Sequence, residues 1–125
     1  MATVRLQQDI TVGTMAPLSK PQSFTCPSLA LIDGETIAVA ASDVVHLFAV
    51  DNSALQVFYM VADQVLTIDT NSAVTPQETF TLVANKPVIF VTGDTAIFAG
   101  DVTQLTVSNA SGVAATLYAY AGMNV

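Results

Sequence analysis

The stretch of sequence that decides the fold is VTQLTVSNASGVAATLYAYA, residues 102–121. Val102–Ser108 and Ala114–Ala121 are strand candidates, because β-branched, threonine and aromatic residues are frequent in both. Between them lies Asn109-Ala110-Ser111-Gly112, a run of residues that favour turns. A strand, a turn and a second strand in so short a stretch predict antiparallel β structure.

Strand-like segments of the same kind recur along the whole chain, separated by runs of Gly, Asn, Asp, Ser and Pro. The other predicted strands are Val4–Val12, Gln22–Thr25, Leu29–Ile32, Thr36–Ala41, Val44–Val50, Leu55–Val61, Val65–Ile68, Thr79–Val83, Val88–Thr92 and Thr95–Ala99. Short strands at regular spacing predict an all-β fold of about 8–11 strands, an antiparallel β-sandwich or a jelly-roll-like barrel. The sequence leaves the sheet order open between a jelly roll, an immunoglobulin-like sandwich and a closed barrel.

Two parts of the chain, residues 21–61 and 76–121, resemble each other. Gly34-Glu35-Thr36 matches Gly93-Asp94-Thr95, and Tyr59 matches Tyr118. Because turn residues match as well as apolar ones, we interpret the two parts as similar β-units whose apolar faces close on each other. The alternative is chance matching between two stretches of the same biased composition.

The first residues differ from the rest of the chain. Residues 1–20 are predicted to form a strand and an extended arm, ahead of a single β-sandwich domain at residues 21–125. In Val4–Val12 apolar and polar side chains alternate, whereas Gly13–Pro21 is rich in Gly and Pro and reads as a linker. Such a strand pairs either within its own sheet or with a neighbouring subunit. The candidate interface residues are Val4, Arg5, Leu6, Ile10 and Val12 of this strand, together with Tyr118 and Tyr120, which share one face of the last strand.

Composition restricts the possible partners. Hydrophobic residues make up 52% of the chain and charged residues only 10%, against about 25% in ordinary domains. This favours a surface that is largely buried in an assembly, although a sandwich solvated by Thr, Ser, Asn and Gln is the alternative. The net charge is −7, and Arg5, Lys20 and Lys86 are the only cations. Neither a nucleic acid nor an anionic membrane is expected as a partner.

No pattern of residues predicts catalysis, a cofactor or a metal site. His46 is the only histidine and lies in an apolar strand, where we expect a hydrogen-bonded histidine at a rim or interface. Cys26 has no basic neighbour in the sequence, which favours a small buried thiol over a nucleophile. Asp33 and Asp94 lie at turns that contain glycine, where a carboxylate commonly bonds its own backbone. A calcium site built from such turns across an interface is the alternative.

The chain shows no signs of secretion. A single cysteine rules out an internal disulfide framework, and no basic segment followed by an apolar one opens the sequence. Asn109-Ala110-Ser111 matches the glycosylation sequon but is more simply read as a turn. No apolar stretch is predicted to span a membrane. We therefore expect synthesis in the cytoplasm.

Residues 79–83, 88–92 and 101–117 are similar to small β-sandwich virion proteins of tailed bacteriophages. The turn and closing strand of that family follow the pattern N-x-S-G-x-A-A-T-L, which here reads Asn109-Ala110-Ser111-Gly112-Val113-Ala114-Ala115-Thr116-Leu117. Size, low charge and richness in Ala, Val and Thr are most like the decoration, or cement, proteins of phage heads. The N-terminal segment matches no particular decoration protein. The resemblance implies a protein that binds the outer capsid lattice, commonly as a trimer at three-fold positions.

Residues and resemblance together lead to one expectation of function. We expect a structural protein without catalytic activity that decorates and stabilises the outside of a phage capsid. Its partners would be the major capsid protein lattice and further copies of itself, in a homotrimer, and it would reach the virion surface from the host cytoplasm. The alternatives are another virion component, such as a minor coat, head–tail or fibre-base protein, or a β-module that binds carbohydrate or a cell surface.

Overall fold

The computed structural model describes residues 2–10, 13 and 18–125, and strands dominate this part of the chain. The elements are β1 (Ala2–Ile10), β2 (Leu18–Cys26), β3 (Ser28–Ile37), β4 (Val44–Val50), the 3-10 turn η1 (Asn52–Ala54), β5 (Leu55–Ala62), β6 (Leu66–Thr70), β7 (Thr79–Leu82), β8 (Val88–Val91), β9 (Val102–Ser108) and β10 (Ala115–Met123). The prediction of an all-β fold is confirmed.

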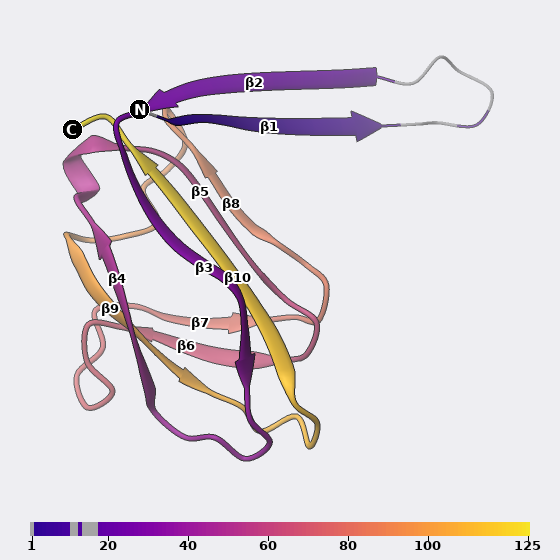
Figure 1. Ribbon diagram of the computed structural model, residues 1–125, viewed down its shortest axis with the longest axis vertical. Coiled ribbons are helices and arrows are strands. Elements are labelled where there is room, and N and C mark those ends of the chain that lie inside the picture. The colour runs from indigo at the N-terminus through magenta and orange to yellow at the C-terminus, as the bar shows by residue number, and fades with distance from the viewer. Residues whose placement is uncertain (1, 11–12, 14–17) are drawn as a thin grey trace.

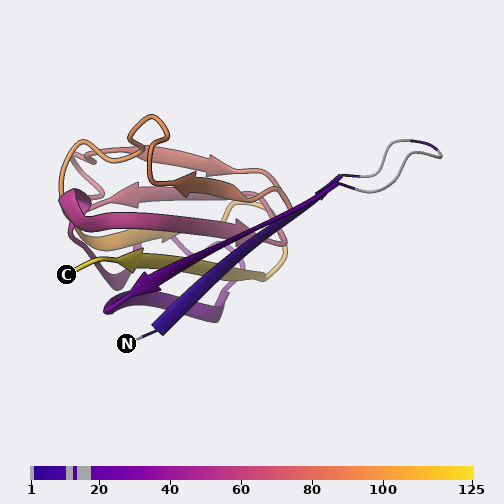
Figure 2. The same ribbon diagram turned by 90° about the horizontal axis from the view of Figure 1, so that it is seen from above.

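Eight of the strands form two antiparallel sheets that pack face to face (Figures 1 and 2). One sheet has the order β3-β10-β5-β8 and is called the β10 sheet; the other has the order β4-β9-β6-β7 and is called the β9 sheet. The chain crosses from one sheet to the other at nearly every connection, and only β6 and β7 are joined as a hairpin within a sheet. This order is that of a jelly roll, one of the two predicted architectures.

The core between the two sheets follows from alternation along the strands. In β10, Leu117, Ala119 and Ala121 are fully buried and face the β9 sheet. Phe58 of β5 lies at the centre, with its ring 6.2 Å from that of Phe48 and 5.2 Å from that of Phe98, both edge to face. Such aromatic pairs add to the burial of apolar area that holds the sheets together.

Phe98 reaches the core from a segment that was predicted wrongly. Thr95–Ala99 reads as a strand, but no strand forms there. The Phe98 ring is nevertheless buried, with 2% of its surface exposed, and its backbone carbonyl accepts a hydrogen bond from Asn52 Nδ2 at 3.1 Å. A segment that buries a side chain without pairing to another strand has the same sequence pattern as a strand. This is why the prediction for Thr95–Ala99 was wrong.

The turn after β9 carries the chain from one sheet to the other. Asn109 is 1% exposed, and its Nδ2 donates to the carbonyl oxygens of Ile37, Ala38 and Val113 at 3.2, 3.2 and 2.8 Å. Its Oδ1 accepts from the backbone N–H of Ser111 at 3.0 Å. The predicted turn is therefore present, and one buried amide side chain joins the backbone at residues 37–38 to the backbone at residues 111–113.

Gly34 and Gly93, which match in the proposed repeat, occupy different structures. Gly34 lies inside β3 with φ +72°, where β3 has one residue more than its partner between Leu117 and Tyr118. The two predicted strands on either side of it are therefore one continuous strand with a β-bulge. Gly93 instead lies in a turn after β8, with φ +98°. The repeat does not extend to equivalent turns, although β3-β4-β5 and β8-β9-β10 visit the two sheets in the same order.

The N-terminal segment differs from its prediction. β1 and β2 pair antiparallel along their whole length, from Ala2 opposite Cys26 to Ile10 opposite Leu18. Residues 18–21, predicted to be linker, are thus part of a strand, and the unit that leaves the sandwich is this N-terminal hairpin, not residues 1–20. Pro21 misled the prediction, because prolines are tolerated in edge strands and β2 is paired on one side only.

Substitution of Asn109 tests the role of the turn. Asn109→Ala removes the side-chain donor for three carbonyl groups, so we expect the free energy of unfolding to fall by about 2–4 kcal/mol. Ser111→Ala, which leaves the bonds from Asn109 Nδ2 in place, is the matched control and should cost about 1 kcal/mol or less. Urea unfolding followed by tyrosine fluorescence measures both; equal losses would contradict the assignment.

Candidate functional site

The outer face of the β10 sheet is unusually apolar. Strand register places the following outward-facing residues on it: Leu29 and Leu31 of β3, Val57, Tyr59 and Val61 of β5, Ile89 and Val91 of β8, and Tyr118, Tyr120 and Gly122 of β10. Leu31 is 54% exposed and Leu29 39% exposed, which is far from the polar outer face expected of an antiparallel sheet. We call these residues the outer apolar face.

The N-terminal hairpin crosses one end of the outer apolar face and then projects beyond the sandwich (Figures 1 and 2). Val4, Phe24 and Cys26 lie on one side of the hairpin, since Val4 pairs with Phe24 and the strand alternates with a period of two. Cys26 is fully buried, whereas Val4 and Phe24 are half-buried. The hairpin is thus held at its base and becomes less covered along its length.

The base of the hairpin is fixed by the absence of a side chain at Gly122. A Cβ atom built on Gly122 would lie 2.5 Å from Cys26 Sγ and 3.0 Å from Val57 Cγ1. Only glycine therefore lets the Cys26 thiol pack directly on the backbone of β10. Burial raises the pKa of this thiol, which favours the neutral form. The thiol has a packing role, in agreement with its predicted character.

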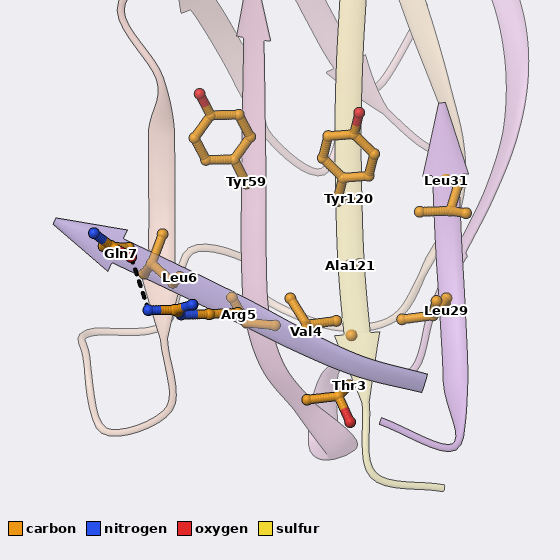
Figure 3. A pocket seen from close by; sticks show the side chains of 12 residues that line it. Thr3, Val4, Arg5, Leu6, Gln7, Leu29, Leu31, Tyr59, Tyr120 and Ala121 are labelled. Atoms are coloured by element: carbon orange, nitrogen blue, oxygen red, sulfur yellow. Dashed lines mark hydrogen bonds between the residues drawn. The ribbon is translucent and has the colours of Figure 1, made fainter. Parts of the chain in front are cut away.

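A groove with a volume of about 470 Å³ lies between β1 and the outer apolar face. One side is formed by residues 3–7 of β1, and the other side by residues of β3, β5 and β10 that include Leu29, Leu31 and Tyr59. Figure 3 shows β1 crossing β10 beside these side chains, with Val4 and Leu6 next to the groove. The Arg5 guanidinium donates to Gln7 Oε1 at 2.9 Å along the same strand.

Three tyrosines form a row beside the groove. The rings of Tyr118 and Tyr120 are stacked with centroids 6.5 Å apart, and Tyr59 on the neighbouring strand lies 6.3 Å from Tyr120. The Tyr120 hydroxyl donates to Asp33 Oδ1 at 3.0 Å. Desolvation, followed by this hydrogen bond to Asp33, raises the pKa of Tyr120. The row offers flat apolar rings with polar tips.

Most of the predicted interface residues meet at this place. Val4, Arg5, Leu6 and Tyr120 all line the groove. Tyr118 is 38% exposed and stacks on Tyr120, so the expectation that the two share a face is confirmed.

The two remaining predicted residues of the first strand do not add to the groove. Ile10 is the last residue of β1, away from the base of the hairpin, and Val12 lies outside the described residues. The sequence analysis missed Leu29, Leu31 and Gly122. The spacing of two residues between Leu29 and Leu31 within a strand could have indicated that they share one face. Gly122 gave no such signal, because its role depends on what packs against it.

The remaining candidates for chemistry are scattered. His46 is half-buried in β4 opposite Leu105, and its Nε2 has no hydrogen-bond partner among the residues that the structure describes, which differs from the expected hydrogen-bonded histidine. Asp94 Oδ2 accepts from the Val91 backbone N–H at 2.9 Å, as expected for a turn. Within residues 2–10, 13 and 18–125, no three His, Cys, Asp or Glu side chains gather as metal ligands. No helix in this part of the chain is long and apolar enough to cross a membrane.

Gly122→Ala tests how the hairpin is held. The added methyl group collides with Cys26 Sγ, so we expect the hairpin base to move away and the Cys26 thiol to react at least tenfold faster with a disulfide reagent. Gly100→Ala is the control, since its Cβ would meet only Gln77 Oε1, at 3.4 Å. Unchanged thiol reactivity in Gly122→Ala would show that the contact does not fix the hairpin.

Alkaline pH provides a second test of the same face. The pKa values of Cys26 and Tyr120 are raised in the folded protein from ordinary values of 9.0 and 10.0, so the unfolded chain loses these protons first. The contribution of these two groups to the free energy of unfolding is therefore fully present below pH 9, and it is lost as the pH rises through their pKa values in the folded protein. Urea unfolding at increasing pH measures the decline, and Tyr120→Phe should reduce it. A decline of the same size in Tyr120→Phe would remove Tyr120 as a cause.

Comparison with models of protein families, with curated proteins and with solved structures finds no match to this chain. The functional assignment therefore rests on three features of the molecule itself. These are the jelly-roll topology, the outer apolar face with its groove, and the hairpin that leaves the sandwich.

Proposed function

We propose that this protein is a structural component of a virus particle that binds and stabilises the outside of a capsid. The single observation that carries the proposal is the outer apolar face, which the protein's own hairpin crosses at one end and leaves open beside it. Surfaces of this kind mark sites where proteins assemble, because isolated soluble proteins rarely expose large apolar patches. The protein would act as a decoration protein on the major capsid protein lattice.

Fold and charge support the same role. Jelly rolls occur in viral capsid proteins and also in lectins and cupins, so the topology allows the role without demanding it. A net charge of −7 would repel packaged nucleic acid and favours a position outside the shell. The resemblance of residues 109–117 to phage virion proteins points in the same direction.

Stabilisation of a shell requires no catalysis. A protein that binds the assembled lattice but not the free capsid subunits shifts the assembly equilibrium towards the particle by mass action. The β9 sheet offers a second apolar area for such contacts, where Leu47 is 87% and Val45 54% exposed on edge strand β4. The apolar area of the β9 sheet would then contact the shell, which leaves the outer apolar face for a neighbouring copy.

Virus particles from cultures that express the gene test the role. We expect the protein to sediment with intact particles and to be released only when the shell is disrupted. An amine reagent that does not enter particles should modify Lys86, which is exposed, whereas internal proteins should stay unmodified. Recovery of the protein in the soluble fraction alone would contradict the proposal, and protection of Lys86 until disruption would place it inside the shell.

A second candidate function, binding of carbohydrate, is favoured by the tyrosine row. Flat aromatic rings stack on sugar rings, and Asp33 beside Tyr120 supplies a hydrogen-bond acceptor. If this is the function, retention on an insoluble polysaccharide should be lost in Tyr118→Ala and kept in Val45→Ala, which changes an exposed residue of the other sheet. Equal behaviour of the two variants would argue against a sugar site at the tyrosine row.

A further inference from the structure

The N-terminal hairpin is packed on the sandwich of its own copy at its base, where Cys26 meets Gly122. A two-stranded hairpin alone in water is marginally stable at best and needs a third strand or a packed apolar face. Here β2 contacts β10 and β5 near its end at Cys26, and both strands then run on, paired only to each other, beyond the edge of the β10 sheet (Figure 1). A partner surface would supply the packed apolar face that the projecting part of the hairpin needs.

The charge of the chain is divided between hairpin and sandwich. Residues 1–26 hold two cations, Arg5 and Lys20, and one acid, Asp9, which gives +1. Residues 27–125 hold one cation and nine acids, which gives −8 and accounts with the hairpin for the total of −7. The surface that fits the hairpin best is thus an acidic, apolar one, and the sandwich of this same chain has both properties.

The outer apolar face is the part of the sandwich that matches the hairpin in shape and chemistry. Its uncovered part holds Leu31, Tyr118 and Tyr120, with Asp33 at its margin. The groove between this part and β1 has room for further side chains. On the hairpin, Val4 and Leu6 of β1 are two residues apart and so occupy one side of the strand by register.

From these observations we propose that the N-terminal hairpin of one copy lies across the outer apolar face of a second copy. The projecting part of the hairpin would cover Leu31 and Tyr118 of that copy, and its positive charge would lie against the acidic sandwich. Pro27 is the single residue between β2 and β3, so the direction of the hairpin is set by a short connection. A connection this short favours contact of the hairpin with a second copy, because the hairpin cannot easily fold back onto its own sandwich.

Hairpin exchange does not depend on a role in a virus particle. Copies joined in this way would associate in solution, whether or not a shell is present. If the protein is found on particles but does not associate in solution, the proposed function is supported and hairpin exchange is contradicted. If it associates in solution but is absent from particles, hairpin exchange is supported and the proposed function is contradicted.

The test uses two versions of the full chain that differ in mass. One version carries Leu6→Cys and the other Tyr118→Cys, both with Cys26→Ser, and they are mixed and oxidised. We expect a disulfide-linked pair of unequal mass, because position 6 of one copy lies on position 118 of the other. The control replaces Tyr118→Cys by Val74→Cys, since Val74 is 90% exposed on a loop that no part of the proposal contacts. Equal linkage to both positions, or to neither, would overturn the proposal.

A second measurement uses no cysteine, and so stays decisive if Cys26→Ser impairs folding. Leu31→Ser changes the outer apolar face, and Leu47→Ser changes an exposed leucine on the β9 sheet. In sedimentation of each purified variant, Leu31→Ser should raise the dissociation constant of the assembly at least tenfold, whereas Leu47→Ser should leave it within about threefold of the natural protein. High salt should weaken the assembly, because the charges of hairpin and sandwich are opposite. A monomeric natural protein, or dissociation by Leu47→Ser alone, would contradict hairpin exchange.

Discussion

The alternation of side chains along β10 is the constraint on which the rest of the structure depends. β10 pairs with β3 on one edge and β5 on the other, so neither edge is free and both faces are used. On the inner face Leu117, Ala119 and Ala121 are fully buried between the two sheets. On the outer face the same period of two presents Tyr118, Tyr120 and Gly122. A shift of one residue would place the tyrosines in the core.

Glycine at position 122 links this constraint to the candidate site. Because no side chain stands there, the Cys26 thiol packs on the backbone of β10 and fixes the direction in which the hairpin leaves the sandwich. The hairpin therefore crosses the apolar face near one end and leaves the tyrosine row and Leu31 open. An open apolar face beside a projecting hairpin is an incomplete interface, which is the physical basis for both proposals.

Polar side chains have different surroundings in the sandwich and at the candidate site. In the sandwich, buried polar side chains serve the fold: Asn109 donates to three backbone carbonyl groups, and Thr70 Oγ1 donates to Glu78 Oε1 at 2.8 Å. At the candidate site, Arg5 and Gln7 of β1 line one side of the groove, and Asp33 and the Tyr120 hydroxyl lie at the margin of the outer apolar face. Apolar side chains bordered by polar groups are also the arrangement of protein interfaces, which is the use that we propose for this face.

The sequence by itself determined the all-β class, the positions of most strands and the shared face of Tyr118 and Tyr120, because a period of two and turn residues are local signals. It also showed that cations are scarce, so the expectation that nucleic acid is not a partner stays a prediction from sequence. Only the tertiary structure decided the jelly-roll order, since strand order depends on which distant segments pair. Tertiary structure alone also made residues 18–21 part of β2, made Gly34 a bulge instead of a turn, and gave Gly122 its role against Cys26. Each of these outcomes depends on a partner far away in the sequence, which no local pattern records.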